Sequence, residues 1–351
     1  MTALWLYSEA LLSSTIVAGL LGGVLAGLLG WIGVSVAFLA KLPLLKLLLS
    51  PNARRPVLTL SSLALMLSAL PASLEGGFSY ATFYLLASIA YGLVSAAIMA
   101  SVLNDVDYSD WRVTLVSSSI ATYTLALIAL IAWSVLGLNL GAPIAVASAL
   151  SIALLAHTLK PPLLPSISLK TVEVLIDIIS FRRSPEEYRL WNADVLKLAL
   201  IMGGLGAVKV TLLSTTIKHY GVNAIIALTA GSLIGSIIAS YTLKPRIAMT
   251  VAIIASATTL TLNKPLIGLA LVNMAITYSN LTVTITTLEN MPKAIYRTIA
   301  TLSIATATGA IMVGAVSLAN PQTATTILTP IATLLLITTI MLTLKRRGKW
   351  E

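Results

Sequence analysis

Residues 160–194, KPPLLPSISLKTVEVLIDIISFRRSPEEYRLWNAD, separate two almost wholly apolar parts of the chain that are similar in length. Ten of the 34 charged side chains fall within these 35 residues. Pro161, Pro162 and Pro165, near the start of the stretch, lack amide donors and break helices. The stretch therefore indicates a water-exposed linker between two membrane-embedded halves.

Beyond the prolines, the linker carries apolar and charged side chains at helical spacing. The apolar positions are Leu169, Val172, Ile176 and Ile179, and the charged ones are Lys170, Glu173 and Asp177. A short amphipathic helix on the membrane surface has this pattern. A loop helix packed on the protein explains it equally well.

The composition of the 351-residue chain is that of a polytopic membrane protein. It is 58% hydrophobic and 10% charged, whereas soluble domains carry roughly 25% charged residues. The first apolar run contains Glu9 and lacks a basic start, so we expect no cleavable signal peptide. The absence of cysteine excludes disulfides and thiolate metal sites.

Apolar segments of about 20 residues, separated by turn residues, predict an all-α protein with twelve transmembrane helices in two six-helix bundles. The predicted units are an N-terminal bundle (1–158), a cytoplasmic linker (159–193) and a C-terminal bundle (194–351). The predicted spans are residues 3–22, 26–49, 56–72, 78–103, 113–135, 141–158, 194–216, 222–242, 247–262, 266–288, 296–319 and 323–344.

The distribution of basic residues predicts that both termini are cytoplasmic and that the protein lies in the cell membrane. With that orientation, 19 of the 22 basic residues fall on the cytoplasmic side. Lys218 and Lys264 fall in outer loops, and Lys209 falls inside a span. The net charge of +10 is thereby explained without nucleic acid as a partner.

Two pairs of inner loops match each other between the halves, which indicates a duplicated six-span unit. The matched positions are Ser50 with Ser240, Arg54 with Lys244, Asp105 with Asn290, and Arg112 with Arg297.

These loops resemble those of the major facilitator superfamily of secondary transporters. Its loop between spans 2 and 3 has the form G-x-L-x-D-R-x-G-R-R, and Arg54 and Arg55 correspond to the final pair of arginines. Ser50 and Ala53 stand where that motif has Asp and Gly. The segment from Asp105 to Arg112 is similar to the acidic-to-Arg pattern after span 4. The resemblance implies twelve spans and alternating access between two bundles.

The basic and acidic residues of the inner loops are candidates for a gate that stabilises one of the alternating states. They are Arg54, Arg55, Asp105, Arg112, Lys244 and Arg297. For Arg54 and Arg55, which we expect at a span end where they bond the last helix carbonyls, a role in topology alone remains open.

In the family that the chain resembles, spans 1, 4, 7 and 10 line the central cavity. The predicted span 10 carries a polar face of Asn273, Thr277, Asn280 and Thr284, which should meet protein or water rather than lipid. Span 4 carries Tyr80, Tyr84 and Tyr91 on one face. Tyr84 and Tyr91 are candidate substrate contacts, with an interfacial aromatic belt as the alternative.

Two charged residues lie inside predicted spans. Lys209, in span 7, is a candidate substrate contact because a charge at this depth is costly, although a lysine that snorkels to the outer surface is the alternative. Glu9, in span 1, is a candidate proton-coupling residue. Solvation of Glu9 at the inner interface is the alternative, and its partner is left open between Lys209 and a basic group near the inner surface.

The predicted function is secondary transport of a small organic solute, by a monomer whose partners are the lipid bilayer and that solute. Proton coupling and facilitated diffusion both remain open. The first alternative is a membrane transferase with Mg²⁺ at Asp105 and Asp107, and the second is a non-transporting membrane protein. P-loop and common hydrolase motifs are absent, so we expect no enzyme, cofactor or resident metal.

Overall fold

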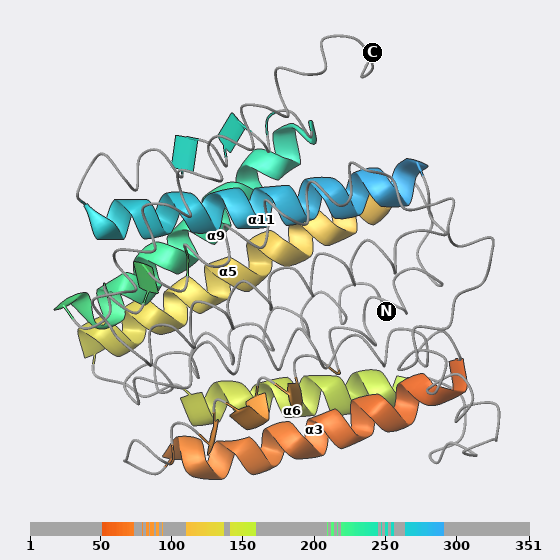
Figure 1. The fold of residues 1–351 in the computed structure, drawn as a ribbon. Helices are drawn as coiled ribbons and strands as arrows, with labels where there is room; N and C mark the ends of the chain where they lie inside the picture. Colours follow the sequence, from red (N-terminus) through yellow and green to blue (C-terminus); the bar gives the residue numbers. More distant parts are fainter. Residues whose placement is uncertain are drawn as a thin grey trace, which may run out of the picture.

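The computed structural model describes five long helices (Figure 1). They are α3 (Pro51–Ser73), α5 (Trp111–Leu136), α6 (Gly141–Thr158), α9 (Val222–Tyr241) and α11 (Pro265–Asn290). The other described residues are 79, 82–83, 85–87, 89–90, 93, 110, 209, 212–213, 216, 219–221, 242–244, 247, 250–251, 254–255 and 264.

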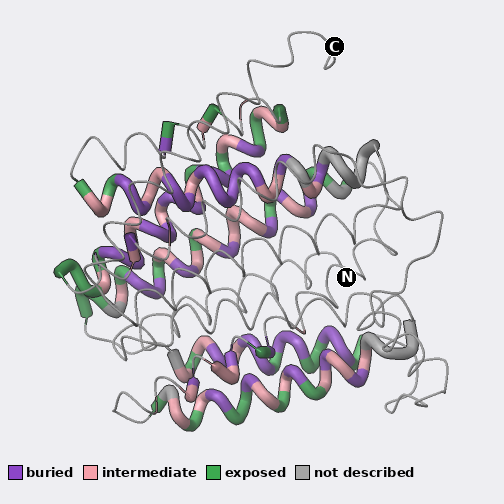
Figure 2. Tube along the Cα trace, in the orientation of Figure 1, coloured by how far each residue is buried: buried purple, intermediate pink, exposed green. Residues whose placement is uncertain are grey.

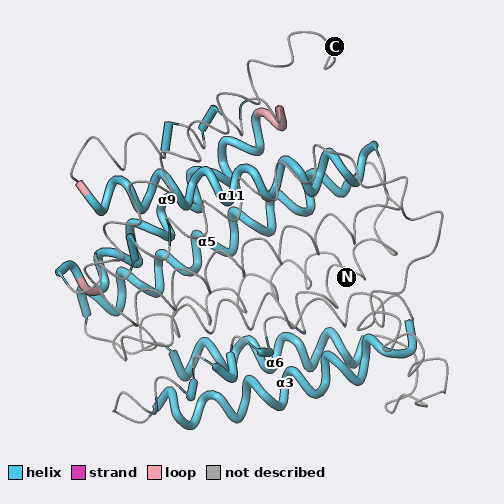
Figure 3. The backbone as a smooth tube through the Cα atoms, viewed as in Figure 1, coloured by secondary structure: helices cyan, strands magenta, loops and turns pink. Residues whose placement is uncertain are grey.

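Four of these helices confirm predicted spans to within two residues at each end. The predicted ranges 113–135, 141–158, 222–242 and 266–288 correspond to α5, α6, α9 and α11. The boundaries follow turn chemistry: Thr242 is extended and its N–H bonds the Ile238 carbonyl at 3.1 Å, and Pro265 opens α11 with a φ already suited to a helix. Figure 3 shows the loop segments at both ends of α9 and before α11.

Helix α3 begins earlier than predicted, at Pro51 rather than at residue 56. Proline reads as a helix breaker, but it is also favoured at the first helical position, where its missing amide has no partner to lose. Arg54 and Arg55 therefore lie in the first turns of α3 rather than in a loop. The positive end of the α3 dipole does not favour cations there, and the carbonyls at the end of span 2 lie outside the described residues.

The surfaces of the described helices fit a lipid environment. The segments Arg112–Leu136 and Val222–Tyr241 are long and apolar enough to cross a membrane. One face of α3 exposes large apolar side chains, visible as the exposed stretches of Figure 2. Such a face would be unusual in a water-soluble monomer. Its most exposed members are Leu60, Leu63, Leu67 and Leu70.

Helices α3 and α6 pack side by side in opposite directions (Figure 1). The Ser62 hydroxyl donates to the Ala149 carbonyl at 2.7 Å. Toward the other end of the pair, Ala69 and Ala142 pack against a buried cluster that includes Phe83 of the predicted span 4. The predicted alternation of span direction requires this antiparallel arrangement.

Candidate functional site

Helix α9 occupies the centre of the candidate site because it packs against both α11 and α5. Small residues recur along it every four positions. One series is Gly231, Gly235 and Ala239, and the next is Ser232, Ser236 and Ser240. Small side chains let helix backbones approach closely in a membrane. The spacing therefore gives α9 two adjacent faces of small side chains, a glycine face and a serine face.

The glycine face of α9 lies directly against α11. A Cβ at Gly231 would stand 2.0 Å from the Ala270 carbonyl oxygen, and one at Gly235 would stand 2.5 Å from that of Met274. Further along, Ala239 packs against the buried ring of Tyr278. Each pair is 39 residues apart, so α9 and α11 run in the same direction, as expected for two even-numbered spans.

Beside this crossing, the polar face of α11 bonds to α9. Asn273 and Thr277 are buried. The Asn273 amide nitrogen donates to the Leu228 carbonyl at 2.9 Å and to the Ser232 hydroxyl. The Thr277 hydroxyl donates to the Ser232 hydroxyl at 3.1 Å. The expectation that these two residues meet protein rather than lipid is confirmed, and both hydrogens of the Asn273 amide nitrogen are engaged.

The serine face of α9 meets α5. The Ser119 and Ser236 hydroxyl oxygens are 2.7 Å apart, and the Ser236 hydroxyl also donates to the Ser232 carbonyl at 2.9 Å. A hydroxyl has one hydrogen to donate. When Ser236 donates to its own helix, it therefore accepts from Ser119. This pair joins residues 117 positions apart, from opposite sides of the predicted linker.

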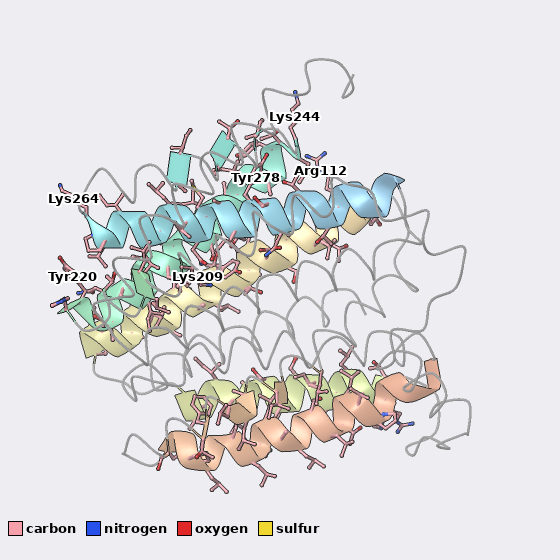
Figure 4. The ribbon with its side chains drawn as sticks, in the orientation of Figure 1. Arg112, Lys209, Tyr220, Lys244, Lys264 and Tyr278 are labelled. Carbon is pink, nitrogen blue, oxygen red and sulfur yellow. The ribbon has the colours of Figure 1, made fainter. Side chains whose placement is uncertain are left out.

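A second bond between α5 and α9 lies at the end of the pair predicted to be cytoplasmic. The exposed Arg112 guanidinium Nη2 donates to the Ser240 carbonyl at 3.2 Å. That carbonyl belongs to the last turn of α9, where carbonyls have no partner within the helix and cations are favoured. Nearby, the Tyr278 hydroxyl donates to the Lys244 carbonyl at 3.5 Å, while the Lys244 side chain is exposed. Figure 4 labels Arg112, Lys244 and Tyr278 in this region.

The remaining described candidates take no part in these bonds. Lys209 is half-buried on a helical segment and lies, along the length of the helices, between Tyr220 and Lys244 (Figure 4). Asn280 and Thr284, further along α11, are half-buried.

The other predicted site residues are only partly described or lie outside the described residues. Arg55 is half-buried, and its carbonyl accepts a bond from the Thr59 hydroxyl at 2.9 Å. For Arg54 the helical backbone alone is described. The candidates outside the described residues are Glu9, Tyr84, Tyr91, Asp105, Asp107 and Arg297.

Sequence reasoning overlooked Ser119, Ser232 and Ser236. The serines of α9 had a signal, since three of them recur at four-residue spacing within an apolar span. Ser119 lies in a run of three serines with no such periodicity.

Comparison with known proteins gives matches at the level of structure. The nucleoside transporter NupG aligns with a TM-score of 0.59 at 14% identity, covering 97% of this chain and 99% of its own. The E. coli fucose:proton symporter FucP aligns with a TM-score of 0.57 at 17% identity, covering 97% of this chain and 96% of its own. The human organic anion transporter MFSD10 aligns with a TM-score of 0.61 at 16% identity, covering 96% of this chain and 99% of its own.

FucP is itself described as a Major Facilitator Superfamily transporter, solved in the outward conformation. No protein-family model matches the sequence, and a search of curated proteins finds no match. At these identities the likeness is one of fold, and it extends over nearly the whole chain.

Proposed function

Because the chain has the twelve-helix fold of major facilitator superfamily transporters, we propose that it is a secondary transporter. It moves a small organic solute by alternating access between its two six-helix bundles. The structural neighbours are named for a nucleoside, for fucose and for organic anions, and each of these solutes is small and organic.

The observation that carries the proposal is the contact between α5 and α9, which joins the two predicted bundles. Its hydrogen bonds include one between two hydroxyls and one from a guanidinium to a carbonyl. A neutral hydrogen bond contributes about 1 kcal/mol net, and one that involves a charged group about 1.5–3 kcal/mol. The contact can therefore be broken and remade, as alternating access requires. Within the C-terminal bundle, by contrast, α9 and α11 are in close backbone contact at Gly231 and Gly235.

A disulfide across this contact should stop transport. The chain has no cysteine, so Ser119→Cys and Ser236→Cys can be introduced together without side reactions. Their hydroxyl oxygens are 2.7 Å apart, a separation that a disulfide can bridge with small shifts. We expect oxidation to abolish nearly all solute uptake by proteoliposomes, and reduction to restore it.

The control for this experiment is a cysteine pair inside one bundle. Ser62 and Ala149 join α3 to α6 within the N-terminal half. Oxidation of Ser62→Cys with Ala149→Cys should leave uptake unchanged, because neither helix needs to move relative to the other. Full uptake by the oxidised variant that carries Ser119→Cys and Ser236→Cys, with the disulfide verified by mass spectrometry, would contradict alternating access at this contact.

Arg112 is a proposed gate residue that bonds directly to the opposite predicted bundle. Arg112→Ala removes its bond to the Ser240 carbonyl. The bond involves a charged but exposed group, so its loss of about 1.5 kcal/mol should shift the equilibrium between closed and open gate roughly tenfold toward the open form. A single Ser119→Cys should then react faster with a membrane-impermeant maleimide applied from the cytoplasmic side.

Arg112→Lys keeps the positive charge near the Ser240 carbonyl and should give an intermediate labelling rate. If the proteins with the native Arg112, with Arg112→Lys and with Arg112→Ala were labelled at equal rates, Arg112 would not be part of the gate. Arg54, Arg55, Asp105, Lys244 and Arg297 complete the proposed gate.

On the solute side, we retain Lys209, Asn280, Tyr84 and Tyr91 as proposed contacts. Asn273 and Thr277 are also retained, although their donors face α9. The carbonyl oxygen of the Asn273 amide is the part of that side chain left to meet a solute. Glu9 is the proposed proton-coupling residue, because it is the only acidic residue within a predicted span away from its ends.

A further inference from the structure

Lys209 is the only charged residue between Lys197 and Lys218, in a stretch otherwise made of apolar, small and hydroxyl side chains. It precedes the turn at Gly221 by twelve residues, which corresponds to about 18 Å of helix at 1.5 Å per residue. The hydrocarbon core of a bilayer is about 30 Å thick. Lys209 therefore lies near the middle of the membrane, where an uncompensated charge is costly.

No counter-charge accompanies Lys209 in the described part of the chain. Asp110 is the only acidic residue whose side chain is described there, and it lies beside Arg112 at the opposite end of α5 from the Gly221 turn. None of the described residues forms a recorded ion pair or hydrogen bond with the Lys209 ammonium.

The rest of the sequence offers one intramembrane acid, Glu9. Glu9 follows the start of its predicted span, at residue 3, by six residues, whereas Lys209 follows the start of its span, at residue 194, by fifteen. Both spans start at the same membrane face, so the two residues differ in depth by about 13 Å. An ion pair needs its charged atoms within about 4 Å of each other. The Lys209 and Glu9 side chains could meet that condition across this depth only if both extended almost fully along the helix axis, so the predicted register disfavours the pair.

Two further buried hydroxyls belong to the predicted span of Lys209 and to α9. Thr216 lies seven residues after Lys209, on the same helical face, and Thr229 lies on α9. Both side chains are at most 1% exposed. Within the described residues, neither hydroxyl has a hydrogen-bond partner. Buried polar groups are normally bonded, so a cation and two hydroxyl donors remain for an acceptor that the described part of the chain does not supply.

On the basis of the proposed transport function, we propose that the solute carries an anionic oxygen group, a carboxylate or a phosphate, which pairs with the Lys209 ammonium. The Thr216 and Thr229 hydroxyls provide neutral donors in the C-terminal half of the chain. The solute compensates the lysine charge, and the lysine excludes organic cations by repulsion. Selection by charge thus arises from one side chain.

The test uses proteoliposomes of the full chain and a defined equimolar mixture read by mass spectrometry. The mixture contains monocarboxylates, dicarboxylates and sugar phosphates, together with neutral sugars, nucleosides and organic amines. We expect the compounds accumulated above protein-free liposomes to be anions. Lys209→Met should reduce their accumulation at least about tenfold, as expected for loss of a buried charge partner, while Lys209→Arg should retain part of it.

Lys264→Met is the matched control, since it removes one positive charge from an exposed position in a loop. It should leave accumulation unchanged. Accumulation of neutral or cationic compounds, or equal accumulation of anions by Lys209→Met and wild type, would overturn the assignment. No accumulation of any compound by wild type would instead contradict the proposed function.

A second measurement, of thermal stability without any solute, keeps the proposal testable if the Lys209→Met protein does not transport because it folds poorly. If Lys209 has no partner in the empty protein, Lys209→Met should raise the melting temperature in detergent, and Glu9→Gln should change it by the same amount in both backgrounds. A lower melting temperature for Lys209→Met that depends on Glu9 would show that the two residues pair, and the proposal would fail.

Discussion

Gly231→Ala should destabilise the protein by about 3 kcal/mol or more, at the upper end of the range for overpacking. The added Cβ would stand 2.0 Å from the Ala270 carbonyl oxygen. That oxygen belongs to the backbone of α11, so relief requires α9 and α11 to separate. Helix propensity alone predicts the opposite sign, because alanine is favoured over glycine in a helix by about 1 kcal/mol. The direction of the change in melting temperature therefore decides between the two effects.

Two further variants on α9 calibrate this result. Gly235→Ala should have a smaller effect of the same sign, because its Cβ would stand 2.5 Å from the Met274 carbonyl oxygen. Ile234→Leu, on the exposed side of α9, keeps the side-chain volume and should change nothing. A Gly231→Ala protein as stable as the Ile234→Leu protein would rule out the close crossing of α9 and α11.

Asn273→Asp should destabilise the protein by about 3 kcal/mol, the scale for an acidic residue at the centre of a transmembrane helix. The substitution replaces an amide that donates to the Leu228 carbonyl and the Ser232 hydroxyl with oxygens that can only accept when ionised. Thermal unfolding in detergent measures the loss.

Asn280→Asp is the matched control for this prediction, because Asn280 lies two turns further along α11 and is half-buried. We expect Asn280→Asp to reduce stability less than Asn273→Asp does. Because Asn280 is a proposed solute contact, its substitution should also change the rate of uptake. Equal losses of stability in both variants would show that the bonds between Asn273 and α9 have no special weight.

Helix positions were largely predictable from the sequence because turn residues mark their ends. Gly141 and Pro143 mark the start of α6, and Lys244-Pro245 and Lys264-Pro265 bracket the segment between α9 and α11. The start of α3 was not predictable, because Pro51 suits both a loop and the first position of a helix.

The candidate site was predictable only on its α11 side. Asn273 and Thr277 stand out because amides and hydroxyls at helical spacing need protein neighbours in a membrane. Ser232 and Ser236 recur at four-residue spacing, but that spacing alone does not predict a neighbouring helix, since a serine can donate to the carbonyl four residues before it, as Ser236 does. The contact of Ser119 with Ser236 depends on how two distant helices pack, which no local pattern encodes.

Helix α9 meets two neighbours at once, with Gly231 and Gly235 against α11 and Ser236 against α5. An insertion or deletion of one residue would rotate everything beyond it by about 100°. The rotation would move glycines out of the interface with α11 and serines out of the interface with α5. Repacking of side chains would not compensate for both losses. We therefore expect one-residue insertions and deletions to be tolerated in the segments flanking α9 but not within α9 itself.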